Sequence, residues 1–152
     1  MGLEHYLYLV KATSLSRHPD PTMVDGFPLE HQRLLVQSWW KHHWVHQWFC
    51  NVHEAANECE EIEVQPEELA TLADKLEAWA DDPEALPPVN DKLRGAFFGA
   101  HPKDPEYEDE RDFHRAKAKD QAKTIRKAVE WLNVPLDPTG REYRYATYRA
   151  SW

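Results

Sequence analysis

The segment WWKHHWVHQWFC, residues 39–50, concentrates the side chains of this sequence that could do chemistry. It holds four of the seven tryptophans and three of the nine histidines. On a helix, His42, His46 and Cys50 would follow one another at intervals of four residues and share one face. Imidazole nitrogen and thiolate sulfur are ligands that zinc prefers. The spacing is therefore compatible with a metal site at these three residues.

Other features of the sequence argue against that metal site. The segment lacks the H-E-x-x-H and C-x-x-C patterns of zinc sites, and ligands in one row along a helix cannot surround a tetrahedral ion. Another segment would have to supply a ligand, for instance Cys59 or His101. Histidines that serve as core and rim residues explain the pattern without a metal. We therefore predict no bound metal and no cofactor.

His46 is the candidate for acid–base chemistry. Neighbouring rings such as Trp39 and Phe49 would partly bury it, and burial keeps an imidazole neutral and able to act as a base. This alternative is a small hydrolase or lyase that uses His46, with or without zinc. The sequence shows no carboxylate placed to orient the ring, no G-x-S-x-G motif and no glycine-rich phosphate loop. Non-catalytic binding is therefore the favoured interpretation.

The aromatic residues could form a wall on which a flat ligand stacks. Arginines close to them in the sequence, Arg141, Arg144 and Arg149, could hold an anionic group such as a phosphate. A nucleotide would suit both halves of such a site. The residues predicted to bind a ligand are Trp39, Lys41, His46, Trp48, Phe97, Phe98, Tyr145, Tyr148 and Arg144. The alternative is that these rings only fill the core.

The elements that must position these residues follow from hydrophobic periodicity. Alternating patterns predict strands over 3–12 and 141–152, and a short strand over 59–64. Spacings of three and four predict helices over 29–53, 66–82 and 107–132, the first of which contains no glycine or proline. We predict a single α+β domain over residues 1–152. Its small antiparallel sheet, built from the N- and C-terminal strands, packs against about three helices.

Charge and composition limit the partners. The chain carries a formal net charge of −9, and residues 54–84 hold twelve acidic residues and a single basic one, Lys75. Direct DNA binding is not expected, because phosphate contacts need clustered basic residues. The sequence lacks a long apolar run and a signal peptide, so we expect no membrane association and a cytoplasmic location. The two cysteines, Cys50 and Cys59, are expected to be reduced.

Four short motifs occur in a fixed order along the chain. They are HYLYLVK near the start, WWKHHWVHQWF, FFG and a closing YRASW. This order resembles that of small phage and prophage proteins of unknown function, with an N-terminal Y-L-Y strand, W-x-K-x-x-x-x-H-x-W-F, F-F-G and Y-x-x-S-W. The matching positions are Trp39, Lys41, His46, Trp48, Phe49, Phe97, Phe98, Gly99, Tyr148, Ser151 and Trp152. His42, His43, Cys50 and His53 lie outside the pattern, which singles out His46.

The resemblance implies a phage accessory protein that works in the host cytoplasm, for example in counter-defence. We predict that it acts by non-catalytic binding of a small anionic ligand, such as a nucleotide signal, or of a host protein. A homo-oligomer is compatible with this function. Besides the enzyme that uses His46, a further alternative is a structural or regulatory protein whose acidic residues 54–84 contact a partner.

Overall fold

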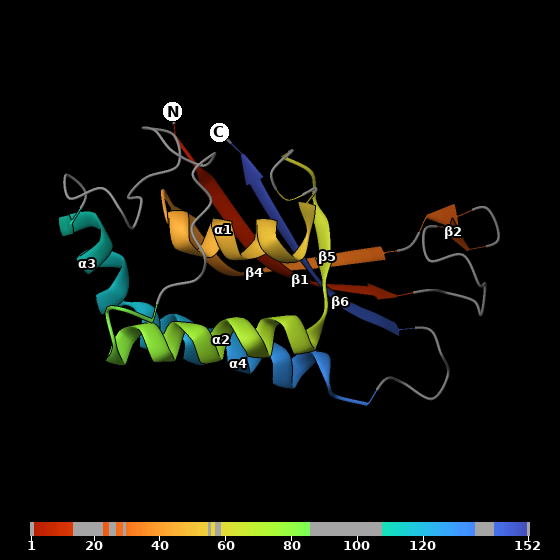
Figure 1. Ribbon diagram of the computed structural model, residues 1–152. Helices are drawn as coiled ribbons and strands as arrows, with labels where there is room; N and C mark the ends of the chain where they lie inside the picture. The colour runs from red at the N-terminus through yellow and green to blue at the C-terminus, as the bar shows by residue number, and fades with distance from the viewer. Residues whose placement is uncertain are drawn as a thin grey trace.

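The computed structural model describes residues 2–13, 23–24, 27–28, 30–54, 56, 59–85, 108–135 and 142–151. The strands are β1 (Glu4–Thr13), β2 (Met23–Val24), β3 (Phe27–Pro28), β4 (Glu30–Trp40), β5 (Ile62–Val64) and β6 (Glu142–Ser151). The helices are α1 (His43–Val52), α2 (Pro66–Asp81), α3 (Glu108–Ala116) and α4 (Ala118–Leu132) (Figure 1). The predicted α+β fold is confirmed.

The main sheet has four antiparallel strands in the order β4-β1-β6-β5 (Figure 1). β1 pairs along its whole length with β4 on one side and with β6 on the other. Glu4 lies opposite Ser151, so the first and last strands of the chain are central neighbours, as the alternating patterns predict. β2 and β3 form a separate two-stranded pair.

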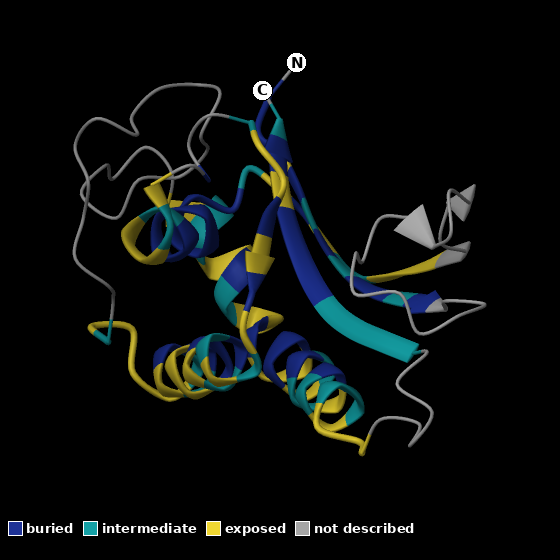
Figure 2. Ribbon diagram, turned by 90° about the vertical axis from the view of Figure 1, so that its right-hand side faces the viewer, coloured by how far each residue is buried: buried dark blue, intermediate teal, exposed yellow. Residues whose placement is uncertain are grey.

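The helices cover one face of the main sheet (Figure 2). On β1 this face carries His5, Leu7 and Leu9, all buried, because successive side chains of a strand point to opposite faces. α1 adds Val45 and Phe49 to the core. The remaining large core side chains come mainly from β6, α2 and α4: Tyr148, Leu69, Leu72, Leu76, Trp79 and Ile125.

α2 begins as the sequence predicts. Pro66 occupies its first turn, and Glu68 accepts a hydrogen bond from the Gln65 backbone N–H at 2.8 Å. The short strand predicted over 59–64 is confirmed in its second half, β5, with Ile62 and Val64 buried and Glu63 exposed. Its pairing with β6 completes the sheet.

The predicted helix over 29–53 is wrong in its first half. Residues 30–40 form β4, and only His43–Val52 is helical. Apolar residues four positions apart in this segment do not share one face, since Leu35 is 56% exposed whereas Trp39 is 4% exposed. A register shift in the pairing with β1, between Leu7 and Tyr8, interrupts the alternation by which β4 could have been recognised. Strand pairing with β1 therefore overrides a locally helical pattern.

The predicted helix over 107–132 is also interrupted. α3 ends at Ala116 and α4 begins at Ala118, with no glycine or proline at the break. The Arg115 side chain donates hydrogen bonds to the Trp79 carbonyl at 2.8 Å and the Ala80 carbonyl at 3.0 Å, both in the last turn of α2. This tertiary anchor holds the end of α3 against α2.

We expect Leu72→Ala to lower the free energy of unfolding by about 2–5 kcal/mol, because Leu72 is completely buried and its truncation leaves a cavity. The neighbouring Thr71 is exposed, so Thr71→Ala should change that free energy by no more than about 0.5 kcal/mol. Urea denaturation of both variants measures the difference. Equal midpoints for the two variants would contradict the described packing of α2.

Candidate functional site

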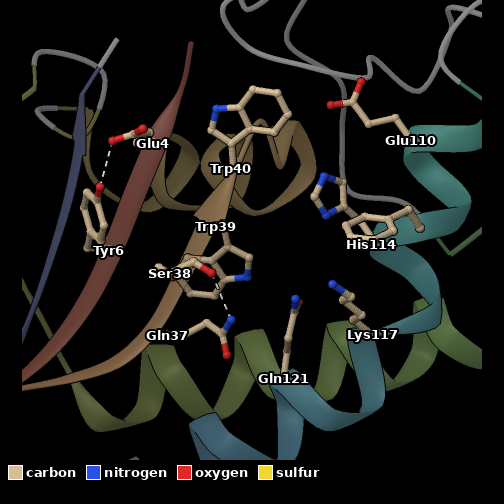
Figure 3. A pocket seen from close by; sticks show the side chains of 11 residues that line it. Glu4, Tyr6, Gln37, Ser38, Trp39, Trp40, Glu110, His114, Lys117 and Gln121 are labelled. Carbon is tan, nitrogen blue, oxygen red and sulfur yellow. Dashed lines mark hydrogen bonds between the residues drawn. The ribbon is translucent and has the colours of Figure 1, made fainter. Parts of the chain in front are cut away.

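A cavity of about 690 Å³ lies where the end of β4 faces α3 and the start of α4 (Figure 3). Its size is within the range of small-molecule sites. Tyr6, Trp39, Trp40 and Phe113 contribute aromatic side chains to its walls. The other lining residues are Glu4, Gln37, Ser38, Glu110, His114, Lys117 and Gln121.

The end of β4 supplies one wall. Trp39 points toward the helices and stacks on His5, with ring centroids 5.1 Å apart, whereas Trp40 points the other way and is 59% exposed. Lys41 then takes a positive φ of 50° and donates its backbone N–H to the Leu3 carbonyl at 2.7 Å. This turn ends the strand and places two indoles at one site.

The break between α3 and α4 supplies the opposite wall. Phe113 lies at the end of α3, Lys117 is the N-cap residue of α4, and Gln121 is one turn further along. Intervals of four residues place the three on one side of the helical segment. The exposed Phe113 ring carries the Lys117 ammonium group at 3.8 Å from its centroid. The interruption after Ala116 thus lies inside the cavity wall.

Two buried polar atoms in this cavity have no hydrogen-bond partner. They are the indole Nε1–H of Trp39 and the amide oxygen Oε1 of Gln121, in residues that are 4% and 7% exposed. Leaving a buried donor or acceptor without a partner costs about 1–3 kcal/mol. Figure 3 shows Trp39, Gln121 and Lys117 directed into the same space. The walls of the cavity therefore contain a buried donor and a buried acceptor without partners, beside a cation.

Histidines from three elements lie behind these walls. His114 stacks on His42 with ring centroids 4.1 Å apart, and His5 stacks on Trp39. The pKa of His114 is lowered to about 4, mainly by burial and to a smaller extent by the Lys117 charge, while a hydrogen bond with the Lys41 backbone opposes the shift. Burial is also the main reason why the pKa values of His5 and His42 are well below the ordinary value of 6.5. All three rings are neutral at pH 7.

His46 lies apart from the cavity, in a buried chain of hydrogen bonds. Its Nδ1 is 2.7 Å from the Tyr148 hydroxyl, which is 3.0 Å from His5 Nδ1, and its Nε2 is 3.4 Å from Cys50 Sγ. Burial raises the pKa of the Cys50 thiol to about 12, so the thiol keeps its proton. Two assignments satisfy all three contacts: protons are donated in sequence from Cys50 through His46 and Tyr148 to His5, or in the reverse direction.

This chain of hydrogen bonds ties together three elements. His46 and Cys50 belong to α1, Tyr148 to β6 and His5 to β1. His5, His46 and Tyr148 are all completely buried, and the Tyr148 ring stacks on Phe49 with centroids 3.7 Å apart. The geometry fits a role in holding α1 on the sheet.

The predicted ligand-binding residues do not form one surface. Trp39 lines the cavity, whereas His46, Trp48 and Tyr148 are buried in the core. The Lys41 ammonium group lies 4.7 Å from the centroid of the Trp40 ring. Phe97 and Phe98 lie outside the described residues.

The remaining two predicted residues lie on β6. Tyr145 faces away from the helices and lines a separate hollow with Arg33 and Glu61. Arg144 stacks on Trp131 at 4.6 Å and donates to Glu142 at 2.5 Å. Neither Arg144 nor Arg149 lines the cavity with Trp39, and Arg141 lies outside the described residues.

Sequence reasoning missed most of the cavity wall contributed by α3 and α4. Phe113, His114, Lys117 and Gln121 line the cavity but are not among the residues that the sequence predicts for a site. Their spacing, with an exposed aromatic residue beside a lysine four residues later, is the pattern that could have found them. What they face depends on the unpredicted strand β4.

The metal site that the histidine spacing permits finds no support in the described ranges. Among these residues, no group of three or more histidine, cysteine, aspartate or glutamate side chains is arranged to hold a metal ion. His42 instead stacks on His114, and its Nδ1 accepts the Val45 backbone N–H at 3.4 Å. Cys50 and Cys59 are both free thiols.

Among the described residues, no helix is long and apolar enough to cross a bilayer.

Comparison with known proteins finds no matching family model, no matching curated protein and no matching solved structure.

The buried histidines predict acid sensitivity. Below about pH 6.5 the unfolded chain binds protons at His5, His42 and His114 that the folded chain does not bind. The free energy of unfolding therefore decreases as the pH decreases. Each group adds about 1.4 kcal/mol per pH unit to the slope of the free energy of unfolding between its unfolded and folded pKa values. Above about pH 7 it adds no slope. Urea denaturation between about pH 7.5 and 5.5 measures this slope. His114→Phe should reduce it, and a flat profile in the parent protein would contradict the burial of neutral histidines.

Proposed function

We propose that this protein binds a small planar ligand, without catalysis, in the cavity between β4 and the α3–α4 segment. One observation carries the proposal: the cavity is walled by aromatic rings and contains a buried donor, Trp39 Nε1, and a buried acceptor, Gln121 Oε1, that lack partners. Each of these unpaired atoms lowers the stability of the free protein. A ligand with complementary groups would satisfy both.

The shape and chemistry of the walls support a planar ligand. Trp40 and Phe113 are more than half exposed although both are large and apolar. Exposed rings at the rim of a cavity provide flat surfaces for stacking, and each stacked base is worth about 1–3 kcal/mol in single-stranded nucleic-acid complexes. A heterocycle of the nucleobase class has a flat face for stacking on these rings. Its edge carries the donors and acceptors that Trp39 Nε1 and Gln121 Oε1 need as partners.

Non-catalytic binding accounts better for the described site than an enzyme based on His46. His46 contacts Tyr148 and Cys50 inside the core and is not among the residues that line the cavity. The histidine at the cavity, His114, is neutral and has no carboxylate hydrogen-bonded to its ring in the described part of the chain. Under the phage-accessory hypothesis, sequestering a nucleotide signal is the activity most consistent with such a cavity.

Gln121→Leu separates a binding role from a structural role. The substitution keeps the approximate volume of the side chain and removes the unpaired acceptor, so we expect the free energy of unfolding to rise by about 1 kcal/mol. Ligand affinity should fall at least about tenfold. The matched control is Gln32→Leu, at an exposed position of β4 that does not line the cavity. Thermal denaturation and isothermal titration calorimetry give the two quantities.

Native mass spectrometry of the purified protein provides the ligand for that titration. A retained small molecule that is absent from Gln121→Leu and present in Gln32→Leu supports the proposal. Loss of stability in Gln121→Leu with unchanged retention of the molecule would show that Gln121 supports the fold and that the ligand binds elsewhere.

A further inference from the structure

Among the described residues Lys117 has no acidic partner, like Lys123 and Lys127 further along α4, and of these three lysines it is the one that lines the cavity. Two residues further on, Lys119 pairs with Asp81 at 2.8 Å, and Arg126 pairs with Asp74 and Glu77. Within the described ranges, no carboxylate lies within ion-pair distance of Lys117, although the chain has 27 acidic residues. Its ammonium group rests instead on the Phe113 ring. A charge kept unpaired in so acidic a chain is available to a ligand.

The Lys117 ammonium group also lies on the cavity side of its helix. Figure 3 shows its end directed toward the space that the Trp39 indole and Gln121 share. Trp39 Nε1 is a donor without an acceptor, and Lys117 is a donor that carries a full charge. His114 beside them is neutral and adds no competing positive charge. The missing component on this side of the cavity is therefore an acceptor with negative charge.

The acidic residues of the cavity lie away from this point. Figure 3 places Glu110 and Lys117 on either side of His114. Glu4 lies on β1, where it accepts the Tyr6 hydroxyl at 2.8 Å. The lining thus has a positive end at the start of α4 and acidic groups toward its rim, so a charged ligand would enter in one orientation.

We infer that the ligand of this cavity carries an anionic group, a phosphate or a carboxylate, which pairs with Lys117 and accepts the Trp39 indole N–H. The inference rests on the proposed function, because the same ligand stacks its planar part on the exposed rings. Binding would draw the ammonium group away from Phe113 and leave that ring free for stacking. An amide or amino hydrogen of the planar part would satisfy Gln121 Oε1.

Matched pairs of compounds isolate the anionic group. The nucleoside 5′-monophosphates AMP, GMP, CMP and UMP are compared with their parent nucleosides, and nicotinate with nicotinamide, by calorimetry. The inference expects at least one anionic member to bind at least about tenfold more tightly than its neutral partner. The phosphate and carboxylate pairs show which anion the site takes.

Lys117→Gln tests the residue. We expect it to remove the preference for the anionic member and to leave the neutral member's affinity within about twofold. The control is Lys127→Gln, which makes the same change of charge at an exposed position on α4 outside the cavity lining and should keep the preference. Loss of the preference in both variants would mean that net charge, and not Lys117, attracts the ligand, which would overturn the inference.

The remaining outcomes separate the two proposals. Equal affinity for the members of each pair overturns the anionic group and leaves planar binding intact. No measurable binding of any of these compounds overturns the anionic inference. If native mass spectrometry also finds no retained molecule, planar binding fails with it. Binding of inorganic phosphate as tightly as any nucleotide would confirm the anion at Lys117 and count against stacking on the rings.

Discussion

The structure depends on the hydrogen bonds that β1 makes along both of its edges. β4 and β6 pair with it over almost its whole length, so these two strands are held in register by one central strand. The register sets His5 opposite Trp39 on one side and Ala150 on the other, and Leu7 opposite Tyr148. The small Ala150 leaves room beside the His5 ring, and the α1 side chains fill the remaining space. The helix-facing core and the cavity wall both derive from this arrangement.

Hydrogen bonding inside this core is incomplete. His5, His46 and Tyr148 are joined by hydrogen bonds, but His5 Nε2 has no hydrogen-bond partner. His42 Nε2 and Trp44 Nε1 also lack partners, in residues that do not line the cavity. Trp39 Nε1 and Gln121 Oε1 belong to residues that line it, and there the stability cost of an unpaired group can be offset by binding.

Local patterns predicted much of the fold. The alternation in 3–12 and in the closing YRYATY segment sufficed for the two central strands, and Pro66 with its following acidic residues marked the start of α2. β4 could not be predicted in this way, because its paired residues on β1 lie 17 to 36 positions away, from Thr13–Glu30 to Glu4–Trp40, and its register shift disrupts the alternation. Lys41 ends the strand with a left-handed conformation that no glycine announces. The break after Ala116 depends on Arg115 reaching α2, which is a contact between distant residues.

The same reasons explain what could be predicted of the site. Trp39 was a predicted ligand-binding residue and does line the cavity, because a dense aromatic segment must lie near any aromatic site. The predicted partners on β6, Arg144 and Tyr145, lie elsewhere, since proximity in sequence to the closing strand did not determine which face each side chain takes. Lys117 and Gln121 could not be predicted as site residues, because their place in the cavity depends on how α4 lies against the end of β4.

The central position of β6 also has a consequence for synthesis. β6 lies between β1 and β5, so the main sheet cannot be completed until residue 151 has left the ribosome. Until then, β1 and β4 can form a hairpin-like pair, but one edge of β1 stays unpaired and the β5 segment has no neighbour. Contacts between segments far apart in sequence are slow to form, and an unpaired strand edge favours association with other chains. The nascent protein is therefore most exposed to misassembly just before its last strand inserts.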